Sequence, residues 1–378
     1  MRLRDLGITI GLLPTGPLNA ITDVPGVRVG HTTLIRDETR EDGTPSAVRT
    51  GVTVIVPHDG DLWREAIYAG CHRLNGNGEL TGLEWIREAG LLEGPIAITN
   101  TKSVGTVRDA IIAAAARDRT PDEFWDLPVV GETWDGWLND INRQIVGAEH
   151  LFSALDSAVA GPVQEGNVGG GTGMICHEFK GGIGTASRRV PEADGGYTVG
   201  VLVQANYGRR DRLAIDGVQV GRAIGFDVVP SAWDEPHQAT GAGSIIVIVG
   251  TDAPLLPHQC TRLAQRAGLG VARTGGGGEN GSGDLFLAFA TGNRGLAGLE
   301  PEQAPLTHAL TAVDDARINP LFWATIEATE EAIANALVAA QTMTGQRGRV
   351  AHALPHDRLR EVFLSQREPD TPQTRQAS

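Results

Sequence analysis

The stretch Gly241-Ala242-Gly243-Ser244-Ile245-Ile246-Val247-Ile248-Val249-Gly250 decides how this chain can fold and react. A glycine-rich approach ends at one hydroxyl residue, and a run of β-branched apolar residues follows it. Such a run is typical of a buried strand. The sequence therefore predicts a strand that begins at Ser244, on the border between mobile backbone and rigid core.

The position of Ser244 on this border indicates a nucleophile. If the bond between Gly243 and Ser244 is cut, Ser244 becomes a new N-terminus whose hydroxyl lies beside its own α-amino group. An α-amine has a pKa of about 7.7–8.0, so near neutral pH it accepts a proton, and no lysine or histidine is required. The alternative is that Gly-x-Gly-Ser only starts a strand.

Composition narrows the class of protein. The 378 residues suffice for one large domain or two ordinary ones, and 41% hydrophobic residues permit a real core. The net charge of −14 argues against nucleic acid and anionic membranes as partners, because both select basic surfaces. We see no signal-peptide pattern at the N-terminus and no run of ~20 apolar residues, so we expect a cytoplasmic protein.

Neither a metal nor a cofactor is indicated. The cysteines Cys71, Cys176 and Cys260 are widely spaced and show no metal-ligand or disulfide pattern. The glycine cluster 274–283 matches G-x-G-x-x-G, but it leads into a strand instead of opening a helix. The histidines are scattered, and no histidine-dependent hydrolase motif appears. A hydrolase with this sequence needs a nucleophile that does not depend on histidine, which points back to Ser244.

Hydrophobic patterns predict strands and helices that are mixed along the chain. We expect strands at 53–56, 95–99, 174–179, 183–190, 197–204, from 244 onward and at 285–290. We expect helices at 62–73, 104–117, 149–159, 258–267, 320–343 and 357–364. Residues 209–243 are predicted to form a long loop, and the polar tail 366–378 to be disordered. This order favours sheets covered by helices.

Three residues stand where they can serve a nucleophile. Ser282 and Asp284 are two apart at the start of a strand, so they share a side, where a carboxylate can orient a hydroxyl that relays a proton. A strand-capping turn is the alternative. Asn206, at a strand end, can donate its amide to an oxyanion or can simply occupy a turn before glycine.

Two further segments can shape a site. The loop Gly166–Gly173 is able to aim several backbone N–H groups at one point. Residues 132–140 concentrate acids and indoles, which suits a pocket for a cationic amine and an apolar side chain. An ordinary helix start is the alternative for this second segment.

With these segments in view, the chain resembles the family of L-aminopeptidase/D-amidase/D-esterases and β-peptidyl aminopeptidases. The resemblance runs from residues 16–26 through 75–82 and the segments above to 319–322, which is nearly the whole chain. It implies an α+β fold, an αββα sandwich similar to N-terminal nucleophile hydrolases but with different connectivity. It also implies one catalytic domain over residues 1–365.

The resemblance further implies that the chain cuts itself between Gly243 and Ser244. The products are an α chain of residues 1–243 and a β chain of 244–378, assembled as a homo-oligomer, a tetramer of αβ units. It assigns the nucleophile to Ser244, the supporting groups to Ser282 and Asp284, and the oxyanion donor to Asn206. It assigns the substrate contacts to Glu132, which holds the free amine, and to Trp134, where some members have tyrosine.

The expected activity is therefore a self-processing serine aminopeptidase that acts on short peptides, amides or esters without a cofactor. Two alternatives remain open. A self-cleaving acyltransferase of the ornithine acetyltransferase type also uses a new N-terminal nucleophile, but usually threonine. A non-enzymatic, glycine-rich ligand-binding protein would keep an intact chain. The family's motifs leave the preference for α-, β- or D-residues open.

Overall fold

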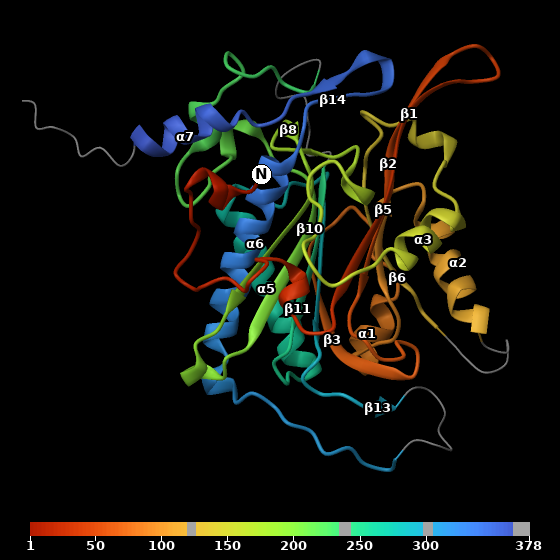
Figure 1. The fold of residues 1–378 in the computed structure, drawn as a ribbon, viewed down its shortest axis with the longest axis vertical. Helices are drawn as coiled ribbons and strands as arrows, with labels where there is room; N and C mark the ends of the chain where they lie inside the picture. The colour runs from red at the N-terminus through yellow and green to blue at the C-terminus, as the bar shows by residue number, and fades with distance from the viewer. Residues whose placement is uncertain (119–125, 234–242, 298–304, 366–378) are drawn as a thin grey trace, which may run out of the picture.

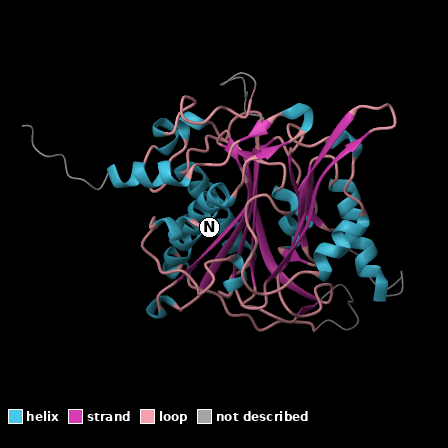
Figure 2. Ribbon diagram, turned by 45° about the horizontal axis from the view of Figure 1, so that its top comes forward, coloured by secondary structure: helices cyan, strands magenta, loops and turns pink. Residues whose placement is uncertain are grey.

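The structure is a computed structural model that describes residues 1–118, 126–233, 243–297 and 305–365. Two β-sheets face each other, and helices cover the outer face of each sheet (Figure 1). Figure 2 shows the strands in the middle with helices on both sides. This four-layer arrangement confirms the predicted αββα sandwich. The tail 366–378 lies outside the described residues.

The first sheet has four strands in the order β1-β2-β5-β6. They are β1 (Arg28–Thr39), β2 (Pro45–Val56), β5 (Ile96–Asn100) and β6 (Val129–Thr133). The helices α2 (Val104–Ala115) and α3 (Ala148–Asp156) pack on its outer face, close to their predicted bounds. Val54, Ile111 and Leu151 belong to the apolar core of this layer pair.

The second sheet has seven strands in the order β13-β3-β12-β11-β10-β9, with β4 beside β3. They are β3 (Glu65–Gly76), β4 (Leu91–Leu92), β9 (Gly182–Arg189), β10 (Thr198–Asn206), β11 (Ser244–Thr251), β12 (Gly283–Ala290) and β13 (Leu296–Ala297). Helices α5 (Pro257–Arg273) and α6 (Asn319–Ala339) cover its outer face. Helix α5 runs past its predicted end, whereas α6 stops short of Met343.

Smaller elements complete the chain. These are α1 (Leu83–Ala89), α4 (Val220–Ala223), α7 (His356–Ser365), and the two-stranded pairs β7 (Ile175–Cys176) with β8 (Phe179–Lys180) and β14 (Met343–Thr344) with β15 (Val350–Ala351). Single 3₁₀ turns lie at Leu3–Leu6, Ile21–Asp23, Ala116–Asp118, Ile141–Arg143, Gly169–Gly171, Glu192–Asp194, Arg210–Arg212, Asp315–Arg317 and Gln346–Gly348.

Three predictions were wrong or incomplete. The single strand predicted at 174–179 is a tight hairpin, because His177 and Glu178 take positive φ angles between β7 and β8. The long loop predicted at 209–243 contains a 3₁₀ turn and α4 within its described part, and residues 234–242 lie outside the described residues.

The helix predicted at 62–73 is the strand β3. Alanine, glutamate and arginine favour a helix locally, but Ile67, Ala69 and Cys71 alternate into the core between the sheets. Gly70 faces the other way, where an added Cβ would lie 2.2 Å from the backbone nitrogen of Thr261 in α5. Burial on both faces of a sheet therefore overrides the local helix propensity.

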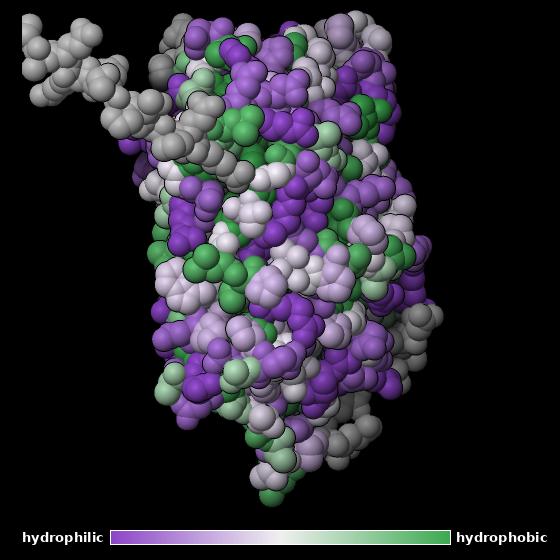
Figure 3. All heavy atoms as spheres, turned by 60° about the vertical axis from the view of Figure 1, so that its left-hand side comes forward, coloured by the Kyte–Doolittle hydropathy of each residue, from purple (hydrophilic) through white to green (hydrophobic). Residues whose placement is uncertain are grey.

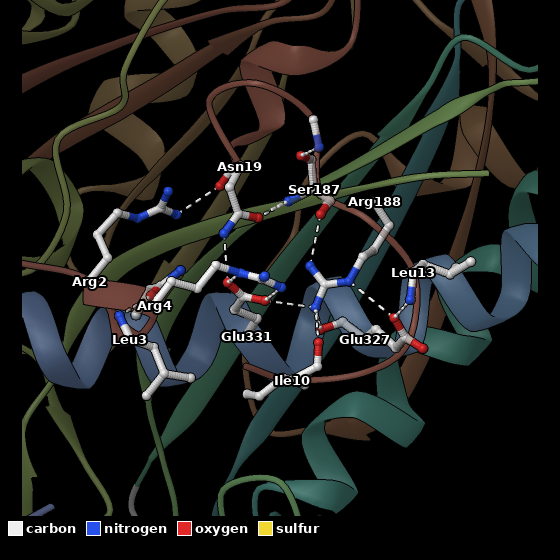
Figure 4. A network of polar contacts seen from close by, with 12 residues as sticks. Arg2, Leu3, Arg4, Ile10, Leu13, Asn19, Ser187, Arg188, Glu327 and Glu331 are labelled. Carbon is white, nitrogen blue, oxygen red and sulfur yellow. Dashed lines mark hydrogen bonds and ion pairs between the residues drawn. The ribbon is translucent and has the colours of Figure 1, made fainter. Parts of the chain in front are cut away.

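A buried ion network ties the N-terminal segment, β9 and α6 together (Figure 4). Arg188 on β9 is fully buried and pairs with Glu327 at 3.1 Å and with Glu331 at 2.7 Å. Arg4 also pairs with Glu331 at 2.7 Å, and Asn19 donates to it at 2.6 Å. Because each buried charge has an opposite partner, the network joins three distant segments without an orphaned ion.

On the face shown in Figure 3, hydrophilic and hydrophobic residues are interspersed. In the part of the chain that the structure describes, no helix is both long and apolar enough to cross a membrane.

We predict that Arg188→Met lowers the free energy of unfolding by about 3–5 kcal/mol, because it leaves the buried Glu327 without its cation. The matched control is Arg189→Met, at the next residue, whose side chain is 45% exposed, pairs with the exposed Glu192 and donates to the Gly196 carbonyl. That variant should stay within about 0.5 kcal/mol of the parent. Urea unfolding measures both, and equal losses in the two variants would contradict a structural role for the network.

Candidate active site

Ser244 is the first residue of β11, at the centre of the seven-stranded sheet. It lies opposite Asn206 of the antiparallel strand β10 and beside Gly283 of the parallel strand β12. Ile246 and Ile248 belong to the core between the sheets, whereas Ile245 packs on the helix side. Strand alternation therefore places Ser244 on the face toward the four-stranded sheet.

One backbone N–H group forms hydrogen bonds with both residues of the Gly243–Ser244 junction. The nitrogen of Gly283 lies 3.3 Å from the carbonyl oxygen of Gly243 and 3.1 Å from Ser244 Oγ, and it donates to both. A Cβ on Gly243 would lie 2.5 Å from the carbonyl oxygen of Asn206 and 2.8 Å from Tyr207 Cα. Only glycine therefore allows this close approach of the junction to β10.

Asn206 is the last residue of β10, and both the oxygen and the nitrogen of its side-chain amide make hydrogen bonds. Its Oδ1 accepts the N–H of Ile175 at 2.8 Å, and its Nδ2 donates to the carbonyl of Trp134 at 2.9 Å. These bonds fix the orientation of the amide and use one of its two N–H hydrogens. The second hydrogen has no acceptor among the described residues, which leaves it able to donate to another group.

Ser282 and Asp284 lie together, as their spacing predicted. Ser282 Oγ donates to Asp284 Oδ1 at 2.6 Å, and the carboxylate also accepts the backbone N–H of Ile245. Asp284 alternates with Phe286 and Ala288, which pack on the helix side. Alternation therefore places the Asp284 side chain on the helix side of the sheet, whereas the Ser244 side chain lies on the face toward the four-stranded sheet. Among the described residues no direct hydrogen bond joins either group to Ser244.

Burial changes the pKa of the Asp284 carboxyl. It raises the pKa of Asp284 to about 6, against the lowering effect of the bonds from Ser282 and from the backbone of Ile245. A carboxyl that titrates near pH 6 is a base of useful strength near neutral pH.

Glu132 is a buried carboxylate on β6 that has no basic partner among the described residues. Its side chain accepts hydrogen bonds from the N–H of Glu79 at 3.0 Å and from Thr101 Oγ1. Burial raises its pKa, and these two bonds oppose the rise. A buried carboxylate that is oriented by neutral donors and lacks a cation can bind an ammonium group.

Gly78 lies between the Glu132 carboxylate and Gly283, the residue that contacts the Gly243–Ser244 junction. A Cβ there would lie 3.0 Å from Glu132 Oε1 and 3.1 Å from the Cα of Gly283. The carboxylate, the bridging N–H group and Ser244 therefore gather around one point between the sheets. Sequence reasoning missed Gly78, Glu79 and Gly283 as site residues. They lie within quoted segments, but only the pairing of distant strands makes their backbone atoms converge.

The segment 132–140 does not form one pocket. Glu132 faces the site and the Trp134 carbonyl holds Asn206, but a Cβ on Gly136 would lie 2.6 Å from the Trp134 indole. Asp140 serves the scaffold instead, because it accepts from Arg40 and Ser46. The side chains turn apart here because the chain leaves β6 in tight turns rather than in a helix.

The loop Gly166–Gly173 does not aim its N–H groups at this site. Gly169 donates to Thr33 Oγ1 at 2.9 Å, and Gly170 donates to Thr53 Oγ1 at 3.1 Å. The glycines instead let the loop pack between the two sheets, since a Cβ on Gly170 would meet Gln204 Oε1 at 2.1 Å.

A cleft opens beside Gly243. Four of the predicted site residues line it, namely Asn206, Gly243, Ser282 and Asp284. Within the described residues, no group of three or more His, Cys, Asp or Glu side chains is arranged to hold a metal ion.

Comparison with known proteins agrees with this geometry. The profile of peptidase family S58 matches residues 19–351. The β-peptidyl aminopeptidase BapA of Sphingosinicella microcystinivorans is 47% identical over 97% of this chain and 92% of its own.

Two solved structures are also similar over nearly the whole chain. A β-aminopeptidase from Burkholderia sp. is 54% identical, with a TM-score of 0.89, and covers 98% of this chain and 100% of its own. The L-aminopeptidase D-Ala-esterase/amidase of Ochrobactrum anthropi is 44% identical, with a TM-score of 0.87, over 97% and 98%. That enzyme is described as a prototype of the serine aminopeptidases and a variant of the Ntn hydrolase fold.

The chain belongs to peptidase family S58 and is an aminopeptidase that hydrolyses peptide bonds. This result confirms the resemblance drawn from the sequence. It favours the peptidase over the acyltransferase and over the non-enzymatic ligand-binding protein.

We predict that Asp284→Asn stabilises the protein increasingly as the pH rises from 4 to 7. The folded-state pKa of about 6 lies above the usual value of 3.8, so between these pH values the unfolded chain has lost this proton while the folded chain keeps it. Wild type therefore loses stability as the pH rises through this range, and asparagine, which does not ionise, does not. Urea unfolding at several pH values measures the difference. Asp109→Asn, at a carboxylate that is 78% exposed, is the control. A variant that is less stable than wild type at pH 7 would mean that Asp284 serves the fold.

Proposed function

We propose that this member of peptidase family S58 cuts its own chain between Gly243 and Ser244 and then uses Ser244 as the N-terminal nucleophile of the aminopeptidase. The observation that carries the proposal is the Gly283 N–H group, which donates to both the Gly243 carbonyl oxygen and Ser244 Oγ. It holds the attacking oxygen and the carbonyl it would attack in one place, and it offers a hydrogen bond to the oxyanion that forms.

Self-cleavage proceeds by an N-to-O acyl shift. Ser244 Oγ attacks the Gly243 carbonyl carbon, the Gly243–Ser244 C–N bond breaks, and the hydroxyl proton ends on the departing amine. The resulting ester joins Gly243 to Ser244 Oγ, and water hydrolyses it to a carboxylate and a free hydroxyl. The products are an α chain of residues 1–243 and a β chain of 244–378 within one catalytic domain.

Turnover uses the amine that this cut releases. The α-amine of Ser244 takes the hydroxyl proton as Oγ attacks the substrate carbonyl, and it returns the proton to the leaving amine. Ser282 and Asp284 are expected to act on this amine, because Asp284 already accepts the backbone N–H of Ile245, the next residue, and because their hydrogen bond orients a hydroxyl for proton relay. The free hydrogen of Asn206 Nδ2 and the Gly283 N–H group stabilise the substrate oxyanion.

Glu132 selects substrates with a free amine. Its buried carboxylate, which lacks a cation, pairs with the substrate ammonium while the first carbonyl carbon reaches Ser244. Trp134 is expected to contact the substrate beside it. The similarity to enzymes named β-peptidyl aminopeptidase and β-aminopeptidase favours N-terminal β-amino acid residues as substrates. A homo-oligomer, a tetramer of αβ units, and a cytoplasmic location remain predictions that rest on the sequence.

We predict that purified protein contains two fragments of about 26 and 14 kDa, in proportion to residues 1–243 and 244–378 of the 39.9 kDa chain. Ser244→Ala should abolish cutting and turnover. Gly243→Ala should slow cutting, because its Cβ would push the junction away from Asn206. Gly105→Ala, where a Cβ meets no atom within 4 Å, is the control. Denaturing mass spectrometry measures the fragments, and a chain that stays intact after long native incubation would overturn self-cleavage.

A second prediction concerns the substrate amine. Acetylation removes its charge and leaves Glu132 buried and unpaired, so it should cost about 2–5 kcal/mol in kcat/KM. Glu132→Gln should lose most of this discrimination, whereas Glu149→Gln, at a side chain 73% exposed, should keep it. The assay compares an amino-acid p-nitroanilide, its N-acetyl form and a β-homo-amino-acid analogue, each with and without chelator. Equal rates on the first two substrates would remove Glu132 from its role, and the third measures the preference for β-residues.

A further inference from the structure

Lys180, on β8, is a fully buried lysine without a carboxylate partner among the described residues. Its Nζ donates to three backbone carbonyl oxygens, those of Gly181 at 2.7 Å, Met174 at 2.9 Å and Gly171 at 3.4 Å. An ammonium group has three N–H donors, so the charged form fits this cage of three acceptors. Burying an ammonium is costly, and such a site needs a reason other than stability.

The cage connects directly to the amide of Asn206. The peptide group between Met174 and Ile175 accepts at its oxygen from Lys180 Nζ and from the N–H of Gly181, both at 2.9 Å. At its nitrogen the same peptide group donates to Asn206 Oδ1 at 2.8 Å. Two hydrogen bonds and one peptide group therefore join the buried charge to the side chain assigned to the oxyanion.

We propose that Lys180 is a positioning residue of the aminopeptidase, whose buried ammonium acts through the Met174–Ile175 peptide on Asn206. The inference rests on the proposed role of Asn206 as oxyanion donor. Hydrogen bonds in a chain polarise one another, most strongly in a low dielectric. The ammonium draws electron density from the peptide oxygen, which strengthens the Ile175 N–H as a donor and thereby the Nδ2–H of Asn206.

The charge on Lys180 is sensitive to pH. Burial lowers its pKa to about 7. Burial also raises the pKa of the Cys176 thiol to about 12, so the thiol is neutral when Lys180 titrates. The other groups that face the ammonium are the three carbonyls of its cage. The charged form is present below pH 7 and is lost as the pH rises.

A second buried cation in the same region provides a matched control. Arg210 is also buried, and it donates to the carbonyls of His177, Glu178, Ile224 and Val229 at 2.9–3.3 Å. None of these carbonyls belongs to the peptide group that holds Asn206. Removal of Arg210 therefore disturbs the fold next to the β7–β8 hairpin without breaking the route from Lys180 to the amide.

The test is a double-mutant cycle of Lys180→Met and Asn206→Ala, with Arg210→Met as control. Rates are measured on an amino-acid p-nitroanilide with a free amine. Each rate is divided by the fraction of chains that are cut between Gly243 and Ser244, as measured by denaturing mass spectrometry. Asn206→Ala should lower kcat by about 10²–10³-fold. Lys180→Met should lower kcat by about 10-fold with KM within about 2-fold, and by less than about 2-fold in the Asn206→Ala background. Arg210→Met should keep kcat within about 2-fold even if its melting temperature falls.

The outcomes separate the two proposals. Wild-type kcat in Asn206→Ala would overturn the oxyanion role in the proposed function. A slow Asn206→Ala combined with an additive effect of Lys180→Met, or with wild-type kcat in Lys180→Met, would overturn the inference about Lys180 alone.

If Lys180→Met does not fold or cut itself, the wild-type enzyme still tests the proposal. The ratio of its kcat to that of Asn206→Ala should fall as the pH rises through about 7, because the α-amine of Ser244 titrates in both proteins and its effect cancels in the ratio. A ratio that does not change with pH would contradict the inference.

Discussion

The position of β11 between an antiparallel and a parallel neighbour is the constraint on which the rest of the site depends. Its pairing with β10 sets Asn206 opposite Ser244, and its pairing with β12 sets Gly283 beside it. Because side chains alternate along a strand, a slip of one residue would turn Ser244 to the helix side and separate it from Glu132. Both faces of β11 are apolar and buried, so the glycines at its two ends oppose that slip: a Cβ at Gly243 would lie 2.5 Å from the Asn206 carbonyl oxygen, and one at Gly250 would lie 2.7 Å from the Phe289 ring. The register that buries the core therefore also builds the site.

The buried charges of this protein fall into two kinds. Arg188, Glu327 and Glu331 satisfy one another, and they join the N-terminal segment to β9 and α6 (Figure 4). Glu132 and Lys180 have only neutral hydrogen-bond partners among the described residues. A paired charge serves the scaffold, whereas a buried charge without a counter-ion is kept at a cost in stability. Lys180 reaches Asn206, which lies opposite Ser244, through two hydrogen bonds and one peptide group. Glu132 lies close to Gly78, which also approaches Gly283 beside Ser244.

Local sequence patterns predicted where the candidate residues lie in their strands better than they predicted some of the scaffold. The strand at Ser244, the Ser282–Asp284 pair and the strand end at Asn206 were predictable because each depends on residues that are close in sequence. The segment 62–73 was not, because β3 is a strand only when the sheet and α5 cover its two faces. The glycine loop 166–173 was misread for the same reason. Its N–H groups bond to Thr33 and Thr53 on strands far away in the sequence.

The sequence by itself determined the family and the class of hydrolase, through motifs that run along nearly the whole chain. A hydroxyl residue after a flexible glycine approach, at the mouth of a buried strand and without a histidine motif, is the basis of the proposed N-terminal nucleophile. The tertiary structure decided what surrounds that residue. Three features depend on backbone atoms: the Gly283 N–H group, the contacts of Gly78 and Glu79 with Glu132, and the carbonyl cage of Lys180. Nearly every residue has these atoms, so a pattern of side chains does not reveal which of them meet. They converge because the hydrophobic cores of two sheets set the strand register, and register is a property of the whole fold.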